Sequence, residues 1–268
     1  MASFSVVSNI ASVNAQANLT VSSTGLNKAL NRLSSGFRIN TSGDDAAGLA
    51  IANNYRSEQA ILTQGIRNAN DGLSTLNIKD GALNNVSLLL DRLATLASQA
   101  SSAAGGVDIG KLEDEYNEVL DEIDREITVG GLDQAAGFSV FVSSEATAAD
   151  GIIAGNIGAA DTTTLGLNQA NWADSSDAQA SLGEISGAIN TLGDVQNSVG
   201  ILQNRLSFAV SLAQSQVVNN TAAQSRIRDA NVAEESANLT RYNILSQSGI
   251  AALSQANQSA SSVLSLLR

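Results

Sequence analysis

The sequence predicts a mainly α-helical protein, a long antiparallel helical rod with coiled-coil-like packing and a small β-hairpin insertion. Proline is absent from the 268 residues, which removes the side chain that most often interrupts helices. Aromatic residues make up 3% of the chain, too few to fill a thick globular core, and this favours long thin helices. Apolar residues recur at helical spacing over most of the chain, which divides it into the elements that follow.

The first predicted helix lies in an N-terminal arm, residues 1–43. Its apolar positions step by three to five residues, the spacing of one helix face. The stripe is narrow, so a partner must cover it, and we assign its residues to an interface between copies. These residues are Val6, Ile10, Val13, Leu26, Leu30 and Leu33. Gly36 and the polar residues 40–43 end the helix, and Ser42 or Asp44 is expected to cap the next one.

Residues 44–127 form the first half of the predicted rod. Apolar side chains repeat in a near-heptad pattern from Leu62 to Ala97, which is typical of a helix packed in a bundle. The Ala-Gly-Gly segment at 104–106 breaks this helix. A shorter amphipathic helix follows through a strongly acidic segment that ends near Ile127, and we expect it to fold back on the first.

The helical period is lost between residues 128 and 172. Alternating apolar and polar residues at 138–142 predict a short β-hairpin insertion there. Helical spacing returns in residues 173–232, the second half of the rod, and continues in a C-terminal arm, residues 233–268. The interface residues of this arm are Leu245, Ile250, Leu253, Leu264 and Leu267. This order brings both termini to one end, where the two arms pair as an inner coiled coil.

The composition excludes most enzyme chemistry. The chain has neither cysteine nor histidine, so it can form no disulfide and no thiolate zinc site, and histidine-based catalysis is excluded. Its glycines form no phosphate-binding motif. We therefore expect no enzymatic activity, no cofactor and no metal. A formal net charge of -12 disfavours nucleic acid as a partner. The sequence contains no run of 18 apolar residues, so we expect no membrane insertion.

Charged residues are distributed unevenly along the chain. No Asp or Glu precedes Asp44 or follows Glu235, so both ends of the chain lack carboxylates while the middle is strongly acidic. Ionised side chains are costly to bury without partners, so a segment that is buried between copies is expected to lack them. Each arm also carries an apolar stripe that it cannot bury alone. The residues therefore favour self-assembly through the arms.

Two sets of motifs at opposite ends of the chain carry a resemblance to a known family. RLSSGFRIN at residues 32–40 is followed by DDAAGLAIAN at 44–53, and the other end holds NLTRYNILSQSGIAALSQANQ and a final LSLLR. Together they resemble the N- and C-terminal signatures of bacterial flagellin. The signature residues between arm and rod are Arg32, Ser35, Gly36, Arg38, Asn40, Asp44, Asp45 and Gly48. A hard-cation site at Asp44 and Asp45 is the alternative to helix capping, and capping is favoured.

The resemblance implies a structural subunit of the flagellar filament used for swimming, in a short form without the large variable outer domains. The sequence TTTLGL at residues 162–167 resembles the return of the outer domain's hairpin. The resemblance also implies self-polymerisation, an extracellular location, and export by the flagellar type III apparatus without a cleaved signal peptide. Implied partners are an export chaperone and the hook-associated and filament-cap proteins. An adaptor at the junction of hook and filament, with similar termini, is the alternative.

A further expectation from the resemblance concerns the host Toll-like receptor that senses flagellin. In flagellins that this receptor senses, an exposed Arg and Leu one turn apart and a Glu on the acidic helix make the contact. These correspond to Arg92, Leu96 and Glu115 of this chain. The alternative is that Arg92 pairs with a nearby acid and that Leu96 packs in the helical seam.

Overall fold

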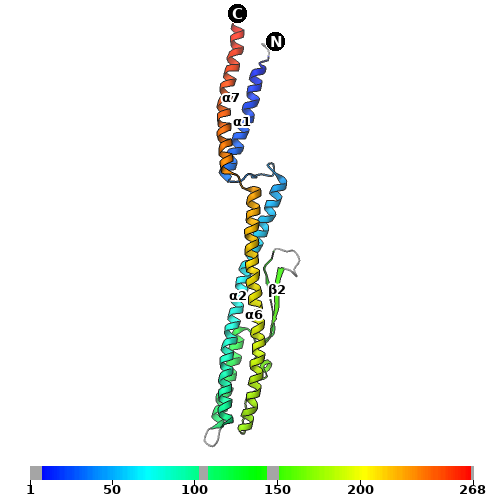
Figure 1. The fold of residues 1–268 in the computed structure, drawn as a ribbon, viewed down its shortest axis with the longest axis vertical. Coiled ribbons are helices and arrows are strands. Elements are labelled where there is room, and N and C mark those ends of the chain that lie inside the picture. The colour runs from blue at the N-terminus through cyan, green and yellow to red at the C-terminus, as the bar shows by residue number, and fades with distance from the viewer. Residues whose placement is uncertain (1–7, 103–107, 144–150, 267–268) are drawn as a thin grey trace. The chain divides into compact units, whose positions relative to one another are not determined.

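The computed structural model describes residues 8–102, 108–143 and 151–266. Its helices and strands are α1 (Ile10–Ser35), α2 (Ala46–Ser101), α3 (Ile109–Gly130), β1 (Ala136–Phe141), β2 (Ile152–Ile157), α5 (Thr162–Leu165), α6 (Ser175–Arg228) and α7 (Val232–Leu266) (Figure 1). The predicted mainly α-helical architecture with a short hairpin is confirmed. The predicted break at 104–106 lies outside the described residues.

The chain divides into two compact units. We call Met1–Ser57 together with Asn219–Arg268 the terminal unit, and Glu58–Val218 the central unit. The predicted borders between arm and rod lie near the breaks between helices, whereas the units divide farther along, inside α2 and α6. One reason is local packing: a Cβ added to Gly48 in the first turn of α2 would lie 2.9 Å from Ile39 Cδ1. The beginning of α2 therefore packs with the segment that precedes it.

The core of the central unit is a seam between α2, α3 and α6. The heptad positions of α2 are buried as predicted, and α3 and α6 contribute their own stripes. Buried residues include Leu62, Ala69, Leu76, Leu83, Val86, Leu90, Leu93 and Ala97 of α2, Tyr116, Ile123 and Ile127 of α3, and Leu192, Val195, Val199, Leu202 and Leu206 of α6. The side-chain amide of Gln203 donates to Asn77 Oδ1 at 3.1 Å. Farther along α6, Leu206 lies beside Gly72, so α2 and α6 run antiparallel (Figure 1).

The hairpin is antiparallel, with a register that runs from Ala136 opposite Ile157 to Phe141 opposite Ile152. A hairpin was predicted in this part of the chain, and its first strand is confirmed. The expectation that residues 162–167 form the return of the hairpin is wrong, because Ile152–Ile157 is the returning strand. Residues Thr162–Leu165 instead form the short helix α5. Asp124 of α3 stabilises its start by accepting hydrogen bonds from the Thr162 amide at 3.0 Å and hydroxyl at 2.9 Å.

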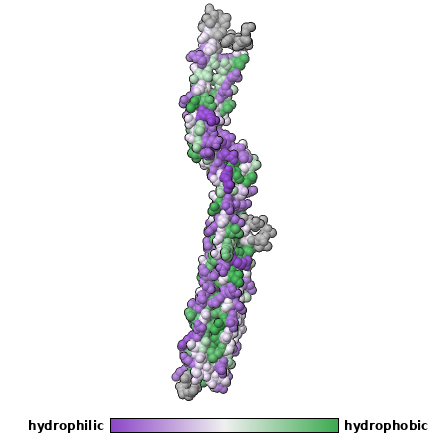
Figure 2. All heavy atoms as spheres, viewed as in Figure 1, coloured by the Kyte–Doolittle hydropathy of each residue, from purple (hydrophilic) through white to green (hydrophobic). Residues whose placement is uncertain are grey.

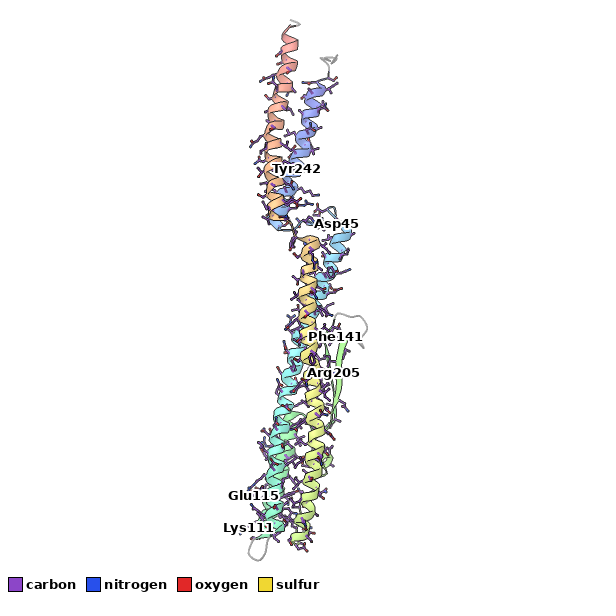
Figure 3. All side chains as sticks on the ribbon, in the orientation of Figure 1. Asp45, Lys111, Glu115, Phe141, Arg205 and Tyr242 are labelled. Carbon is purple, nitrogen blue, oxygen red and sulfur yellow. The ribbon has the colours of Figure 1, made fainter. Side chains whose placement is uncertain are left out.

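Two glycines of α2, one heptad apart, allow the hairpin to lie close to the helix. A Cβ added at Gly65 would lie 2.2 Å from the carbonyl oxygen of Val142, and one at Gly72 would lie 2.8 Å from Val140 Cγ2. On the other strand, the guanidinium of Arg205 donates to the carbonyl of Ala154 at 2.9 Å. Figure 3 shows Arg205 on α6 near the hairpin. The hairpin is thus fixed to both long helices of the central unit.

Candidate assembly interface

The terminal unit is built on an antiparallel pair formed by α1 and α7. Asn9 directly precedes α1, and its Nδ2 donates to the carbonyl of Ala256 at 2.9 Å. Near the opposite end of the pair, Arg32 Nη1 lies 2.8 Å from Glu235 Oε1. Between these contacts the ring of Tyr242 lies against Gly25 (Figures 1 and 3). The predicted pairing of the two arms is confirmed.

The pair covers only part of the predicted interface residues. Leu26, Leu33 and Leu253 are half-buried in the pair. Exposed in the single chain are Ile10, Val13, Leu30, Leu245 and Ile250. Val6 and Leu267 lie outside the described residues, and Leu264 lies within the bounds of α7. Val232 and Ile244 are exposed too, although neither was assigned to the interface.

The exposed residues of α1 form a stripe on one face. Ile10, Val13 and Val21 are 61%, 62% and 68% exposed, and Ala17 lies between them. At about 100° per residue these positions are grouped on one side of α1, roughly 125° around the helix from Ser22 and Ala29. Those two residues are buried in the pair with α7. Figure 2 shows apolar patches on the visible surface of the terminal unit. The stripe is therefore not covered by α7.

The two segments that join the arms to the long helices are connected by a short backbone ladder. The amide of Arg38 donates to the carbonyl of Arg228 at 2.7 Å, and the amide of Ala230 donates to the carbonyl of Gly36 at 2.9 Å. Phe37 and Asp229 form the bridge between them. The guanidinium of Arg228 also lies over the Phe37 ring, 4.1 Å from its centroid. The sequence predicted a break at the first segment and only a border between rod and arm near the second. It did not predict the ladder, because helical periodicity carries no signal for a single bridge.

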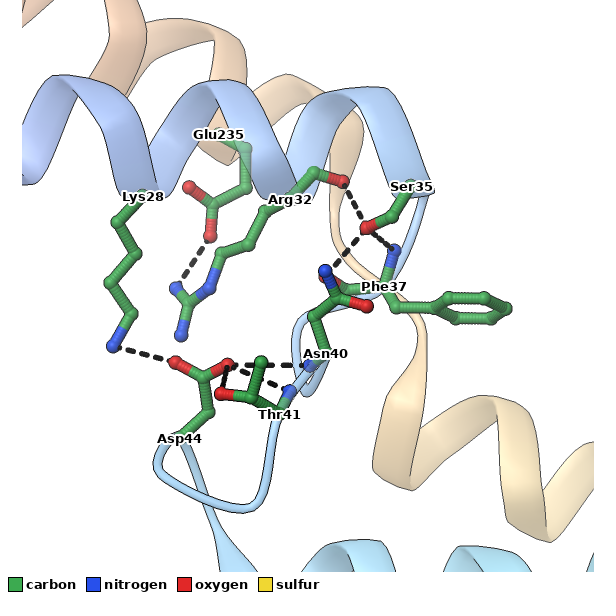
Figure 4. Close-up of polar contacts among 8 residues, drawn as sticks. All are labelled: Lys28, Arg32, Ser35, Phe37, Asn40, Thr41, Asp44 and Glu235. Carbon is green, nitrogen blue, oxygen red and sulfur yellow. Dashed lines mark hydrogen bonds and ion pairs between the residues drawn. The ribbon is translucent and has the colours of Figure 1, made fainter.

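The end of α1 follows the predicted signature. Gly36 adopts a left-handed conformation, with φ of 75°, and its amide donates to the carbonyl of Arg32. Ser35 Oγ accepts a hydrogen bond from the Phe37 amide at 3.2 Å (Figure 4). Arg38 Nη2 donates to the carbonyl of Ile227 at 2.8 Å, so this side chain supports the ladder as well. Glycine is the residue that adopts this conformation without strain.

Asp44 organises the loop between α1 and α2. Its Oδ2 accepts hydrogen bonds from the amides of Asn40 at 3.3 Å and Thr41 at 3.2 Å, and its Oδ1 lies 2.9 Å from Lys28 Nζ (Figure 4). The hydrogen bond from Lys28 and those from the loop amides lower the pKa of Asp44 to about 2. The carboxylate is therefore held ionised by α1 and by its own loop.

The cap of α2 corrects the sequence prediction. Asp45, not Ser42 or Asp44, accepts the hydrogen bond from the Gly48 amide, at 2.9 Å, and its carbonyl accepts the next amide of the helix. Asp45 directly precedes the first helical residue, which is the position from which a short side chain reaches the third helical amide. Over the part of the chain that the structure describes, no cluster of three or more acidic side chains is placed to hold a metal ion. No described helix is long and apolar enough to cross a membrane.

The predicted receptor residues are not all exposed. Arg92 of α2 and Glu115 of α3 form an ion pair, in which Arg92 Nε donates to Glu115 Oε1 at 3.1 Å. Leu96, one turn along α2, is fully buried, so the expectation that it is exposed is wrong. It packs in the three-helix core in line with Leu93 and Ala100, as the alternative interpretation held. Figure 3 shows Glu115 at the α2–α3 end of the central unit.

Comparison with known proteins gives matches at both ends of the chain. The family model described as the bacterial flagellin N-terminal helical region matches residues 6–132, and the bacterial flagellin C-terminal helical region matches residues 182–267. The flagellin of Halalkalibacterium halodurans is 34% identical over 97% of this chain and 98% of its own length. The flagellin of Bacillus subtilis is 32% identical with the same coverage, and flagellin FlaB1 of Treponema pallidum is 31% identical. A crystal structure of Bacillus cereus flagellin covers 59% of this chain and 94% of that chain, with 26% identity and a TM-score of 0.46.

Proposed function

Because the chain belongs to the bacterial flagellin family, we propose that its copies polymerise through the apolar faces that the α1–α7 pair leaves exposed. Members of this family are structural subunits of the extracellular flagellar filament and not enzymes, and this chain is one of them. Swimming motility is the use that we propose for the filament. The observation that carries the proposed interface is the exposed stripe of Ile10, Val13 and Val21.

The chemistry of the arms supports this interface. Three large apolar side chains on one face of a two-helix pair form the kind of surface that marks a contact with another protein. The same arm has no carboxylate before Asp44, so covering the stripe desolvates no acidic group of that arm. A second copy of the chain supplies a stripe of the same kind. Packing between copies then buries what one copy cannot.

A carboxylate placed in the stripe tests the proposed interface. Val13→Asp is expected to reduce the sedimentable filament formed by the purified chain by about tenfold or more, because the charge would be buried between copies. Val13 is exposed, so the substitution is expected to leave the folding of the single chain unchanged. The measurement is sedimentation at raised protein concentration, with electron microscopy of the pellet.

Ser23→Asp is the matched control for that experiment. It adds the same charge to an exposed position of α1 that lies outside the stripe. Filaments from Ser23→Asp together with their loss in Val13→Asp would support the proposed face. Normal assembly of Val13→Asp would show that the stripe is not an interface. The unmodified chain also decides between the two structural functions, because a junction adaptor assembles in few copies and does not form long filaments.

We propose that the α7 arm binds an export chaperone before the chain is exported by the flagellar type III apparatus. The supporting feature is its exposed apolar set, which includes Ile244, Leu245 and Ile250 and which needs cover before assembly. The hook-associated and filament-cap proteins are proposed to contact the same arms at the filament ends. Copurification of the flagellar export chaperone with the full chain, weakened by Leu245→Asp, would support the first of these.

Recognition by the host Toll-like receptor is a separate proposal that now rests on Arg92 and Glu115. Both side chains are about half exposed, at 50% and 42%, at the surface between α2 and α3. A partner carboxylate that approached Arg92 would compete with Glu115 for the guanidinium. Receptor activation by the full chain is expected to fall in Arg92→Ala. Equal activation by the variant and the unmodified chain would contradict it.

A further inference from the structure

The seam between α1 and α7 repeats along both helices. On α1, Leu19, Leu26 and Leu33 are seven residues apart and half-buried. On α7, half-buried residues also recur every seven positions, at Leu239, Ser246 and Leu253. When one helix slides by seven residues, another leucine of α1 takes the place of each leucine that moves away. The leucines therefore do not by themselves select one alignment of the arms.

Among the contacts that are not repeated along the pair are an ion pair and a close fit of a ring against a glycine. Glu235 is 8% exposed and is the one buried charged side chain in the described part of the chain, and its Oε1 lies 2.8 Å from Arg32 Nη1. One heptad farther along α7, the ring of Tyr242 lies against Gly25, where an added Cβ would be 2.6 Å from ring atoms Cε1 and Cζ. Each contact joins one specific residue of α1 to one of α7. Figure 4 shows the ion pair beside the loop that follows α1.

We propose that Arg32 and Glu235, supported by the Gly25–Tyr242 contact, fix the register of the two arms. A slide by one heptad in one direction places Glu235 opposite Gly25, which has no side chain to pair with the carboxylate. A slide in the other direction places it beyond Ser35, where α1 ends. Either slide removes Arg32 from a carboxylate that has little access to water, and an unpaired buried charge is strongly unfavourable. Setting a register is the best attested use of such a buried polar contact.

The same two slides also remove the glycine from under Tyr242. The ring would meet position 18 or position 32 of α1, and both of these carry side chains, Asn18 and Arg32. The ion pair is further favoured by its place in the helices. Arg32 lies in the last turn of α1 and Glu235 in the first turn of α7, where each charge opposes the helix dipole. Both contacts therefore favour the observed alignment over its neighbours.

The register matters because it sets the exposed surfaces of the pair. The stripe of Ile10, Val13 and Val21 on α1 and the exposed residues of α7 have one relative position only when the helices have one register. Under the proposed function, identical copies must present identical surfaces to form a helical polymer. The inference therefore rests on the proposed function and names Arg32 and Glu235 as positioning residues for assembly.

Disulfide trapping in the full chain measures the register directly. The chain contains no cysteine, so a disulfide can form only between introduced residues. A Cβ added to Gly249 would lie 3.7 Å from Leu19 Cβ, close to the distance of about 3.8 Å in a disulfide. The pair Leu19→Cys with Gly249→Cys therefore reports the native register. The pairs of Gly249→Cys with Leu26→Cys or with Ser12→Cys report slides by one heptad in the two directions.

Without any further substitution, the native cysteine pair is expected to form a disulfide, and the two slipped pairs are expected to form none. Glu235→Gln, which keeps the shape of the side chain, is expected to lower the ratio of native to slipped intrachain disulfide by about tenfold. Yields are measured by intact mass after mild oxidation, in soluble and sedimented material. Lys28→Gln removes a positive charge from the more exposed ion pair of the same helix and is expected to leave the ratio unchanged.

Exchanging the two charges gives a readout that loss of stability alone would not give. Arg32→Glu alone is expected to lower the native-to-slipped ratio, and Arg32→Glu with Glu235→Arg to restore part of it. The restoration is partial because the exchange places a negative charge at the C-terminal end of α1 and a positive charge at the N-terminal end of α7, where each interacts unfavourably with the helix dipole. An unchanged ratio in Glu235→Gln would overturn the proposal and leave the Gly25–Tyr242 contact and the backbone ladder at Phe37 and Asp229 as the features that set the register. If the ratio is unchanged in Glu235→Gln and filaments still form, the proposed function stands and only the register proposal fails. If the unmodified register is trapped as expected but the chain forms no filaments, only the proposed function is contradicted.

Discussion

Asp44 and Asp45 are neighbours in the sequence with different structural roles. Asp45 caps α2, whereas Asp44 binds the loop amides of Asn40 and Thr41 and pairs with Lys28. The motif predicted that this carboxylate pair organises the break between helices. Which of the two caps the helix depended on where the first helical residue lies, and a sequence pattern locates helix ends only to within one or two residues. The three-dimensional loop decided the roles.

Asp44→Asn is expected to destabilise the terminal unit in a pH-dependent way. The pKa of Asp44 is about 2 in the folded chain, against an ordinary value of 3.8. Its contribution is therefore fully present above about pH 4 and is lost as the pH falls through about 2. Because Lys28 is half exposed, we expect about 1 kcal/mol at pH 7. Urea unfolding followed by far-UV circular dichroism at pH 7 and near pH 2 measures the difference.

The matched control for Asp44→Asn is Asp91→Asn, which removes an exposed carboxylate from α2. It is expected to change the free energy of unfolding by less than about 0.5 kcal/mol at either pH. A loss in Asp44→Asn that is equally large at pH 7 and near pH 2 would show that the ion pair and loop hydrogen bonds are not its cause.

At the scale of the element, α2 shows which features of a helix are visible in its sequence. Its buried heptad positions, among them Leu76 and Leu90, were predicted from spacing alone. The docking of the hairpin on Gly65 and Gly72 was not predicted. Within a helical pattern a glycine signals only a lower helix propensity, and nothing in the spacing says that another backbone lies against it. That information exists only once the hairpin has folded back.

Two alanine substitutions in α2 are expected to have opposite effects. Gly65→Ala should lower the free energy of unfolding of the central unit by about 1–3 kcal/mol, because the added Cβ meets the Val142 carbonyl. Gly81→Ala should raise it by up to about 1 kcal/mol, because Gly81 has open space around it and alanine is the better helix former. Urea unfolding followed by the fluorescence of Trp172, which is buried beside Tyr116, measures both. Equal effects from the two substitutions would contradict the close docking of the hairpin.

At the scale of the whole molecule, the two units differ in how much of their apolar surface a single chain buries. The central unit has one continuous buried core, which draws on α2, α3 and α6. Within the terminal unit, the α1–α7 pair buries few residues, Ser22, Ala29 and Glu235, and its large apolar side chains remain partly or fully exposed. A two-helix pair with so little buried area gains most of its stability from packing against neighbours.

Removal of both predicted arms, residues 1–43 and 233–268, tests this difference. The shortened chain is expected to keep the central core and to form no filament, because the exposed apolar stripe is lost with the arms. The urea midpoint reported by Trp172 should remain close to that of the full chain, since this residue lies in the core of the central unit. Filament growth equal to that of the full chain would show that assembly does not depend on the arms.

The sequence by itself determined the helical class, the positions of the long helices, the hairpin's first strand, and the absence of carboxylates before Asp44 and after Glu235, which indicates self-assembly. These features are periodic or compositional, and they depend on burial averaged over many residues. Tertiary structure decided that Leu96 is buried, that Asp45 caps α2, that residues 162–165 are helical, and that Arg32 meets Glu235. Each of these depends on a single contact between residues that folding brings together. A single contact has no periodic signal in the sequence, so it cannot be predicted from spacing or composition.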